Sequence, residues 1–132
     1  MRQLNNYVDA ASLSPRVGAG EGFVSIGRLA NEKGVDTTIR AIGQVPGAKL
    51  TVAGDGPQRA ELEALAESVA PGQVRFAGHV SAAEVAELNR SARAAVAVAR
   101  WHENMPLSVL ETMGASVPLI VSGLGGLPEL VD

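Results

Sequence analysis

The stretch FVSIGRLANEKGVDTTIRAIGQVPGAKLTVAG, residues 23–54, holds two short apolar runs separated by a segment with a different period. In that segment Val35, Ile39 and Ile42 recur at the spacing of one face of an α-helix. Each apolar run ends at a glycine and is nearly continuous in hydrophobicity, as in strands that are covered on both faces. The stretch therefore predicts a strand, a helix and a second strand.

Strands and helices go on alternating after this stretch. Further apolar runs occupy residues 73–78, 94–99 and 118–123. Helical spacing recurs between the runs, in the sets Leu62, Leu65 and Val69, then Val85, Leu88 and Ala92, then Val109, Leu110 and Met113. This alternation predicts an α/β fold, a doubly wound, Rossmann-like parallel sheet with right-handed crossovers. In such sheets, ligands bind beyond the carboxyl ends of the strands, where helices begin.

Start signals support three of the helices. Pro57 precedes the second helix, and Pro106 suits the first turn of the fourth. Ser81 and Glu84 have the spacing of a capping box at the start of the third.

The regular pattern begins only at residue 22. Residues 1–21 have no sustained period and contain Pro15, Gly18 and Gly20. We therefore expect a lead-in or linker there, and one domain over residues 22–132. The sequence closes on GGLPELVD, where the pattern of a further helix begins, so we expect a sheet that is incomplete at the C-terminus and a chain that is a fragment.

The composition indicates one globular domain. Of the 132 residues, 46% are hydrophobic and 19% are charged, which is enough apolar material for a core. The net charge of −3 argues against a nucleic-acid partner, which favours basic surfaces. The sequence has no cysteine and two histidines, so we expect neither a disulfide nor a metal ion. Because it shows neither a long apolar run nor a signal-peptide pattern, we expect a cytoplasmic protein.

Two cations follow the first predicted strand. The segment GRLANEKG, residues 27–34, carries Arg28 and Lys33 around a short turn that leads into a helix. An arginine fork and a lysine ammonium at the mouth of a strand are suited to hold a diphosphate. The alternative is that both are solvated loop residues, as most arginines and lysines are. Their position at the expected ligand edge favours the diphosphate interpretation.

Two glutamates lie around the start of the fourth helix. In WHENMPLSVLE, residues 101–111, Glu103 precedes Pro106 and Glu111 lies inside the helix. Eight residues at helical rise span about 12 Å, whereas the carboxyl pairs of glycosidases lie about 5–9.5 Å apart, so we expect no such pair. With the helix-start amides of residues 105–109 between them, the carboxylates suit the two ends of an extended polar ligand. The alternative is two solvated charges, one of them favoured by the helix dipole.

Three glycine-containing turns follow other predicted strands. GDGP, residues 54–57, is ordinary turn sequence. GHV, residues 78–80, offers a glycine beside His79, for which a base-contacting role and a plain surface role are equally open. GLGGLPE, residues 123–129, allows either close approach to a ligand or a tight turn. No stretch matches a dinucleotide fingerprint or a phosphate loop, which disfavours a dehydrogenase or a methyltransferase.

In this order and spacing, the segments resemble the C-terminal, nucleotide-sugar-binding domain of family 4 glycosyltransferases of the GT-B fold. The resemblance covers nearly the whole chain and rests on GRLANEKG, GDGP, FAGHV, WHENMPLSVLE and VPLIVSGLGGLPELV. It implies the donor half of an enzyme that transfers a sugar from a nucleoside-diphosphate sugar, with UDP or GDP as the nucleotide. It further implies retention of anomeric configuration and no requirement for a metal ion or other cofactor.

The resemblance also implies roles for individual residues. Arg28 and Lys33 would hold the donor diphosphate, Glu103 would contact hydroxyls of the transferred sugar, and Glu111 would bind the ribose. The first three are the expected catalytic residues. The expected donor-binding set comprises Gly27, Gly78, His79, Val80, Asn104, Met105, Pro106, Leu107, Ser108 and Glu111. Pro106 has no N–H to donate to a ligand.

The chain departs from the family pattern in places. The family often has Pro-Ser where this chain has Ala99 and Arg100, which we expect to alter sugar contacts. It often has glycine in place of Ser116, a change that we expect to affect the helix end. We expect the acceptor-binding N-terminal domain to lie outside this chain, any membrane association to occur through that domain, and no turnover by the chain alone. The alternative function is a non-catalytic nucleotide-binding or interaction module on the same scaffold.

Overall fold

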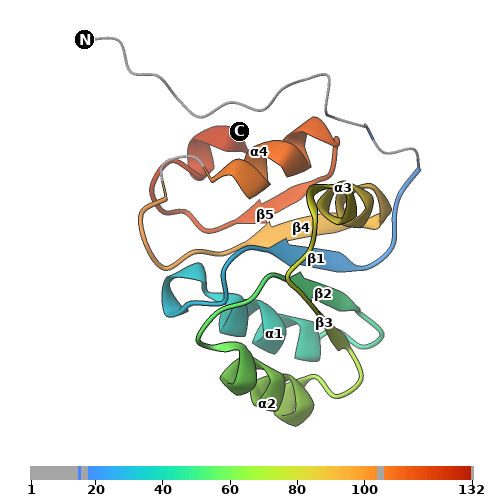
Figure 1. Cartoon of the computed structure of the whole chain (residues 1–132), viewed down its shortest axis with the longest axis vertical. Helices are drawn as coiled ribbons and strands as arrows, with labels where there is room; N and C mark the ends of the chain where they lie inside the picture. The colour runs from blue at the N-terminus through green and yellow to red at the C-terminus, as the bar shows by residue number, and fades with distance from the viewer. Residues whose placement is uncertain (1–14, 16–17, 104–105, 132) are drawn as a thin grey trace.

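The computed structural model describes residue 15 and residues 18–103 and 106–131. Its centre is a five-stranded parallel sheet in the order β3-β2-β1-β4-β5 (Figure 1). The strands are β1 (Phe23–Ile26), β2 (Leu50–Ala53), β3 (Val74–Gly78), β4 (Ala94–Ala97) and β5 (Leu119–Val121). Each strand lies within the apolar run that predicted it, and the doubly wound parallel sheet is confirmed.

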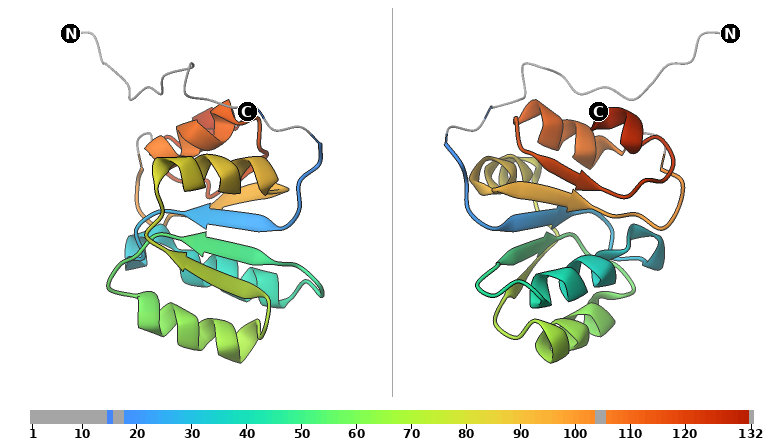
Figure 2. Two further views of the ribbon diagram at one scale, coloured as in Figure 1. Left: turned by 45° about the vertical axis from the view of Figure 1, so that its right-hand side comes forward. Right: turned by 180° about the vertical axis from the view of Figure 1, so that it is seen from behind.

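Four α-helices connect the strands, two on each face of the sheet. They are α1 (Val35–Gly43), α2 (Arg59–Val69), α3 (Ala82–Ser91) and α4 (Leu107–Gly114), with short 3-10 turns η2 (Asn31–Lys33) and η3 (Pro128–Leu130). Figure 2 (left) shows α3 in front of the sheet and α1 behind it, and α2 packs against α1. The winding reverses between β1 and β4, because β2 and β3 extend the sheet on one side of β1 and β4 and β5 on the other. The helix expected at the end of the sequence is the single turn η3.

The two faces of the sheet carry different cores. Under α1 and α2 lies a cluster of mostly large side chains: Leu29, Val35, Ile39, Ile42, Leu50, Val52, Leu62, Ala66 and Ala70. The clusters under α3, α4 and η3 use smaller ones: Val24, Ala92, Ala95, Ala115 and Val117, then Ala99, Val109 and Leu127. A buried hydrogen bond links α4 to α3, since the Thr112 hydroxyl lies 3.0 Å from the Asn89 side-chain oxygen.

The third helix begins as its sequence predicts. The Ser81 hydroxyl accepts the Glu84 amide at 3.2 Å, and the Ser81 amide donates to the Glu84 carboxylate at 2.6 Å, so the capping box is confirmed. The hydrogen bond from the Ser81 backbone lowers the pKa of the Glu84 carboxyl. Pro57 precedes α2 as expected, with Gln58 as the N-cap.

The fourth helix buries a different stripe from the predicted one. Val109 and Thr112 are the buried residues of α4, whereas Met113 is 40% exposed, so the expectation that Met113 packs inward is wrong. Thr112 lies three residues after Val109 and faces α3, where Asn89 satisfies its hydroxyl. The apolar pattern did not predict that Thr112 is buried, because that pattern counts only apolar side chains and threonine is polar. Ser116, at φ 57°, occupies the left-handed position that follows the helix, as the glycine pattern of the family implies.

The lead-in lies mostly outside the described residues, so the division at residues 21 and 22 stays a prediction. Within the described part, the Glu21 amide donates to the Ser91 carbonyl at 2.8 Å, which ties the start of β1 to the end of α3. None of the described helices is both long enough and apolar enough to cross a membrane.

Candidate functional site: a cleft between the ends of β1 and β4

A cleft opens where the winding of the sheet reverses. It lies beyond the carboxyl ends of β1 and β4, which are neighbours in the sheet, and it encloses about 440 Å³ of space open to solvent. Its walls include Gly27, Arg28, Leu29, Lys33, Ala97, Ala99, Glu103, Pro106, Ser108 and Leu127. A reversal point is the place where an open parallel sheet binds its ligands, because the loops on either side diverge there.

The turn after β1 presents the two predicted cations differently. Leu29 is buried at 1% exposure, and its amide donates to the Asp55 carbonyl at 2.9 Å, which anchors the turn. The anchored turn leaves Arg28 exposed, and within the described part of the chain its guanidinium has no ion pair. Lys33 ends η2 and is half-buried at the cleft wall. Both cations therefore line the cleft, as expected, but only Arg28 keeps its charge uncompensated.

The loop after β4 is fastened to the turn after β1. The Arg100 amide donates to the Glu32 carbonyl at 2.7 Å, and the Arg100 guanidinium bonds Asn31 at 3.0 Å, Thr37 at 3.2 Å and the Asp36 carboxylate. Ala99, the neighbouring residue, is buried at the cleft wall. The Arg100 side chain thus joins α1 to the loop after β4, a contact that no local sequence pattern predicts.

Gly34 makes a second contact between the same two loops. It has φ 62°, and a Cβ added to it would lie 2.0 Å from the Val98 carbonyl oxygen. No side chain fits in that space, so only glycine lets the backbones meet here.

The glycine loop after β5 supports Glu103. The Gly126 amide donates to the Glu103 carbonyl at 2.8 Å, and a Cβ on Gly125 would lie 2.6 Å from the same oxygen. The sequence left close approach to a ligand and a tight turn as alternatives for this loop. The close approach that the structure shows is to the backbone of Glu103, so this loop fixes where Glu103 lies.

The two sides of the cleft meet in an ion pair. The Lys33 ammonium donates to a Glu103 carboxylate oxygen, with side-chain exposures of 31% and 16%. Lys33 comes from the turn after β1 and Glu103 from the loop after β4, 70 residues apart in sequence. Sequence reasoning placed both residues at the site, but it did not pair them with each other.

The start of α4 contributes Pro106 and Ser108 to the cleft wall, whereas the predicted residue Leu107 is 53% exposed and does not line it. Pro106 is the N-cap, at ψ 132°, so its expected place in the first turn is wrong by one residue: the ring fixes φ, but the extended ψ keeps it outside the helix. Its carbonyl accepts the amides of Val109 at 3.1 Å and Leu110 at 3.3 Å. The Val109 amide is therefore not available to a ligand, contrary to expectation. The amides of Leu107 and Ser108 come before the first residues that bond to the Pro106 carbonyl, so they have no acceptor within the helix.

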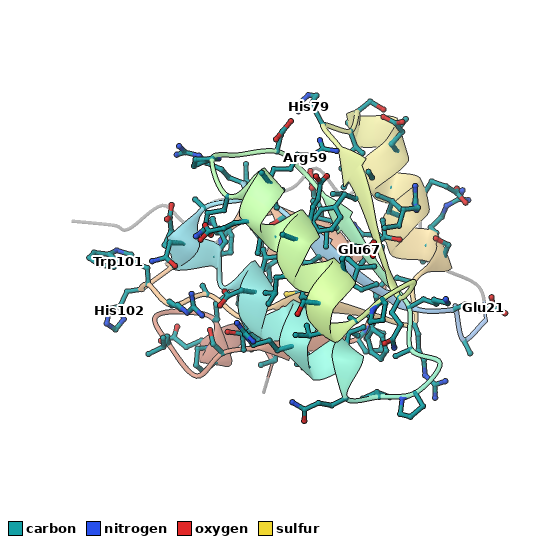
Figure 3. The ribbon with its side chains drawn as sticks, turned by 90° about the horizontal axis from the view of Figure 1, so that it is seen from below. Glu21, Arg59, Glu67, His79, Trp101 and His102 are labelled. Atoms are coloured by element: carbon teal, nitrogen blue, oxygen red, sulfur yellow. The ribbon has the colours of Figure 1, made fainter. Side chains whose placement is uncertain are left out.

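Several predicted residues do not line this cleft. Gly78 ends β3 and His79 and Val80 follow it, and β3 is separated from β1 by β2. Figure 3 shows His79 well away from Trp101 and His102. Glu111 lies one helical turn after Ser108, half-buried, and is not part of the cleft wall. Asn104 and Met105 lie outside the described residues. Among the residues that are described, no group of three or more His, Asp or Glu side chains is placed to hold a metal ion.

Comparison with known proteins identifies the family of the whole domain. The model of the family "Glycosyl transferases group 1" matches residues 16–132. Glycogen synthase of Mycobacterium tuberculosis is 37% identical over 139 residues, 97% of this chain and 33% of the relative. The GDP-mannose-dependent alpha-(1-6)-phosphatidylinositol dimannoside mannosyltransferase of the same species is 35% identical over 114 residues, 83% of this chain and 29% of the relative.

A solved structure supports the fold. HepE of Anabaena, crystallised in complex with UDP and glucose, superposes with a TM-score of 0.78 at 21% identity, over 86% of this chain and 32% of that chain. The chain spans about a third of the length of each of these proteins.

Proposed function

The chain belongs to the glycosyl transferases group 1 family, and from that premise we propose that it is the donor-binding half of a retaining glycosyltransferase of family 4 that uses a nucleoside-diphosphate sugar. The observation that carries the proposal is the cleft at the winding reversal, where Arg28, Lys33, Glu103 and the start of α4 converge. The acceptor-binding domain, and any membrane contact, belong to a part of the protein outside this chain. The complete enzyme acts in the cytoplasm.

The diphosphate of the donor binds between the two cations and the helix start. Arg28 offers a planar fork to two phosphate oxygens, and Lys33 offers a point charge. The amides of Leu107 and Ser108, with the positive end of the α4 dipole, add neutral donors on the opposite wall. Together these groups match the doubly negative diphosphate of a nucleoside-diphosphate sugar.

The sugar and nucleoside lie on either side of that diphosphate. Glu103 is held by the glycine loop at the cleft wall, where its carboxylate accepts hydrogen bonds from sugar hydroxyls. Glu111, one turn into α4, binds the ribose. The base reaches Gly78–Val80 across the end of β2, a distance of roughly 10 Å at the usual spacing of strands.

The chemistry consists of leaving-group stabilisation. The anomeric carbon gives up its bond to the diphosphate oxygen and forms one to an acceptor hydroxyl on the same face of the sugar, and the proton of that hydroxyl passes to the departing diphosphate. Negative charge grows on the departing diphosphate, and Arg28, Lys33 and the α4 amides are already in place to neutralise it. No metal ion is needed, because the protein itself supplies the positive charge.

Calorimetry with UDP and GDP tests the proposal directly. We expect the chain to bind one of them weakly, Arg28→Ala or Lys33→Ala to weaken that binding strongly, and the chain alone to transfer no sugar. Lys49→Ala is the matched control, because Lys49 is an exposed lysine at the start of β2 whose ammonium bonds the Gly72 carbonyl. Binding of neither nucleotide would favour a module for another ligand. Equal losses in all three variants would contradict the assignment of the diphosphate to this cleft.

A further inference from the structure

Lys33 enters the ligand-free cleft already neutralised by Glu103. Their ion pair is partly buried, with 31% and 16% of the side chains exposed, so solvent screens it less than a surface pair. Arg28, in contrast, has no ion pair within the described residues. An incoming anion therefore meets Arg28, which has no ion pair within the described residues, and Lys33, which is already paired with Glu103.

A nucleoside diphosphate and a nucleotide sugar differ in what they offer Glu103. A diphosphate that takes Lys33 from Glu103 leaves that carboxylate partly buried without a partner, and such a charge is unfavourable. A nucleotide sugar brings hydroxyl donors to the same place, so Glu103 exchanges the ammonium for hydrogen bonds to the sugar. Only the sugar-bearing ligand satisfies both residues at once.

We propose that Glu103 competes with bound diphosphate for Lys33, so that the cleft favours a nucleotide that still carries its sugar over one that has lost it. The inference rests on the proposed function, because it assumes that Lys33 meets the diphosphate. It adds a second role for Glu103: once the sugar has left, Glu103 recaptures Lys33 and weakens the hold on the spent nucleotide. Glu103 thereby acts as a specificity and product-release residue.

The exchange of partners by Lys33 and Glu103 requires no movement of the backbone on either side of the cleft. The backbone of Glu103 is fixed by Gly126, and the turn that carries Lys33 is fixed by the Arg100 amide on Glu32. Because both backbones are held, the exchange requires only rotation of two side chains. Lys33 has four carbons of reach to follow either partner.

The substitution Glu103→Gln distinguishes two roles of Glu103: competing with the diphosphate for Lys33, or holding Lys33 in position for the diphosphate. If Glu103 competes, the substitution should tighten binding of UDP or GDP by roughly two- to tenfold, the range for losing a partly screened ion pair. If Glu103 merely positions Lys33, the same substitution should weaken nucleotide binding. UDP-glucose and GDP-mannose serve as the sugar-bearing probes, and their preference over the matching free nucleotide should fall in the variant.

Two controls remove the simpler explanations. Glu32→Gln deletes one negative charge next to Lys33 in sequence but leaves the ion pair intact, and it should leave nucleotide affinity nearly unchanged. In the Lys33→Ala background, Glu103→Gln should no longer tighten binding, because there is no cation left to release. The inference is overturned if Glu103→Gln leaves UDP and GDP affinity unchanged or lower, if Glu32→Gln reproduces its effect, or if the effect survives without Lys33. Failure of every variant and the parent chain to bind either nucleotide would instead overturn the proposed function.

Discussion

The half of the domain around β2 and β3 is built from large side chains, and the half around β4 and β5 from small ones. The first half buries Leu50, Val52, Ile39 and Leu62 between its strands and α1 and α2, whereas the second relies on alanines such as Ala95 and Ala115. Large side chains remove more apolar area from water, so the first half contributes most of the stability. Small residues let backbone loops approach one another, and the cleft lies where such loops meet. The difference indicates that the large-residue half supplies most of the stability, whereas the cleft takes its walls from both halves, with Leu29 and Lys33 on one side and Ala99 and Glu103 on the other.

Truncating the large-residue core should have the greatest effect of all on folding. Ile39 is fully buried, so Ile39→Ala should lower the free energy of unfolding by about 2–5 kcal/mol. Urea denaturation followed by circular dichroism measures it. The comparison itself is tested by the same substitution in each half, Val52→Ala and Val117→Ala. We expect the larger loss at Val52, which lies in a strand with neighbours on both sides, and equal losses would remove the distinction between the halves.

Placing a methyl group between the two loops should affect binding and stability together. Gly34→Ala adds a Cβ 2.0 Å from the Val98 carbonyl, so the backbones must separate. Gly47→Ala is the control, because Gly47 has a similar positive φ of 78° with nothing within 4 Å of the added atom. Both should lose roughly 1–2 kcal/mol from the left-handed conformation. Gly34→Ala should lose additional stability beyond that shared cost, and it alone should weaken binding of the nucleotide, measured by calorimetry. If Gly34→Ala and Gly47→Ala have equal effects on stability and binding, the contact between the two loops has no importance.

The sequence predicted the strands and helices of the domain better than it predicted the contacts between residues at the cleft. Within the described residues, apolar runs and helical spacing located the five strands and the four α-helices, because burial leaves a strong local pattern. Arg28, Lys33 and Glu103 were placed at one edge by topology alone. The Lys33–Glu103 pair was not predictable, since the partners are 70 residues apart and nothing local in either segment indicates the other. The same holds for Gly125, whose neighbour is decided by how the loops after β4 and β5 fold together.

Substitution of Arg100 has the smallest expected effect on stability, and it tests whether the position of the loop after β4 affects binding independently of stability. Its ion pair with Asp36 is partly exposed, at 44% and 27% of the side chains, so Arg100→Ala should lower the free energy of unfolding by at most about 1 kcal/mol. Arg90→Ala, which removes an exposed pair with Glu87 on α3, should have a similarly small effect on thermal unfolding. The two should differ in calorimetry with a nucleotide sugar.

Loss of the guanidinium frees the loop that carries Glu103 from Asn31, Asp36 and Thr37, so Arg100→Ala should weaken binding of the nucleotide sugar and Arg90→Ala should not. Arg100→Lys should restore that binding only in part, because one ammonium cannot replace a planar fork that meets three acceptors. If all three variants bind the nucleotide sugar like the parent chain, the Arg100 amide and Gly34 suffice to hold the loop. The side-chain contacts of Arg100 would then be dispensable, and the position of the loop that carries Glu103 would depend on backbone contacts alone.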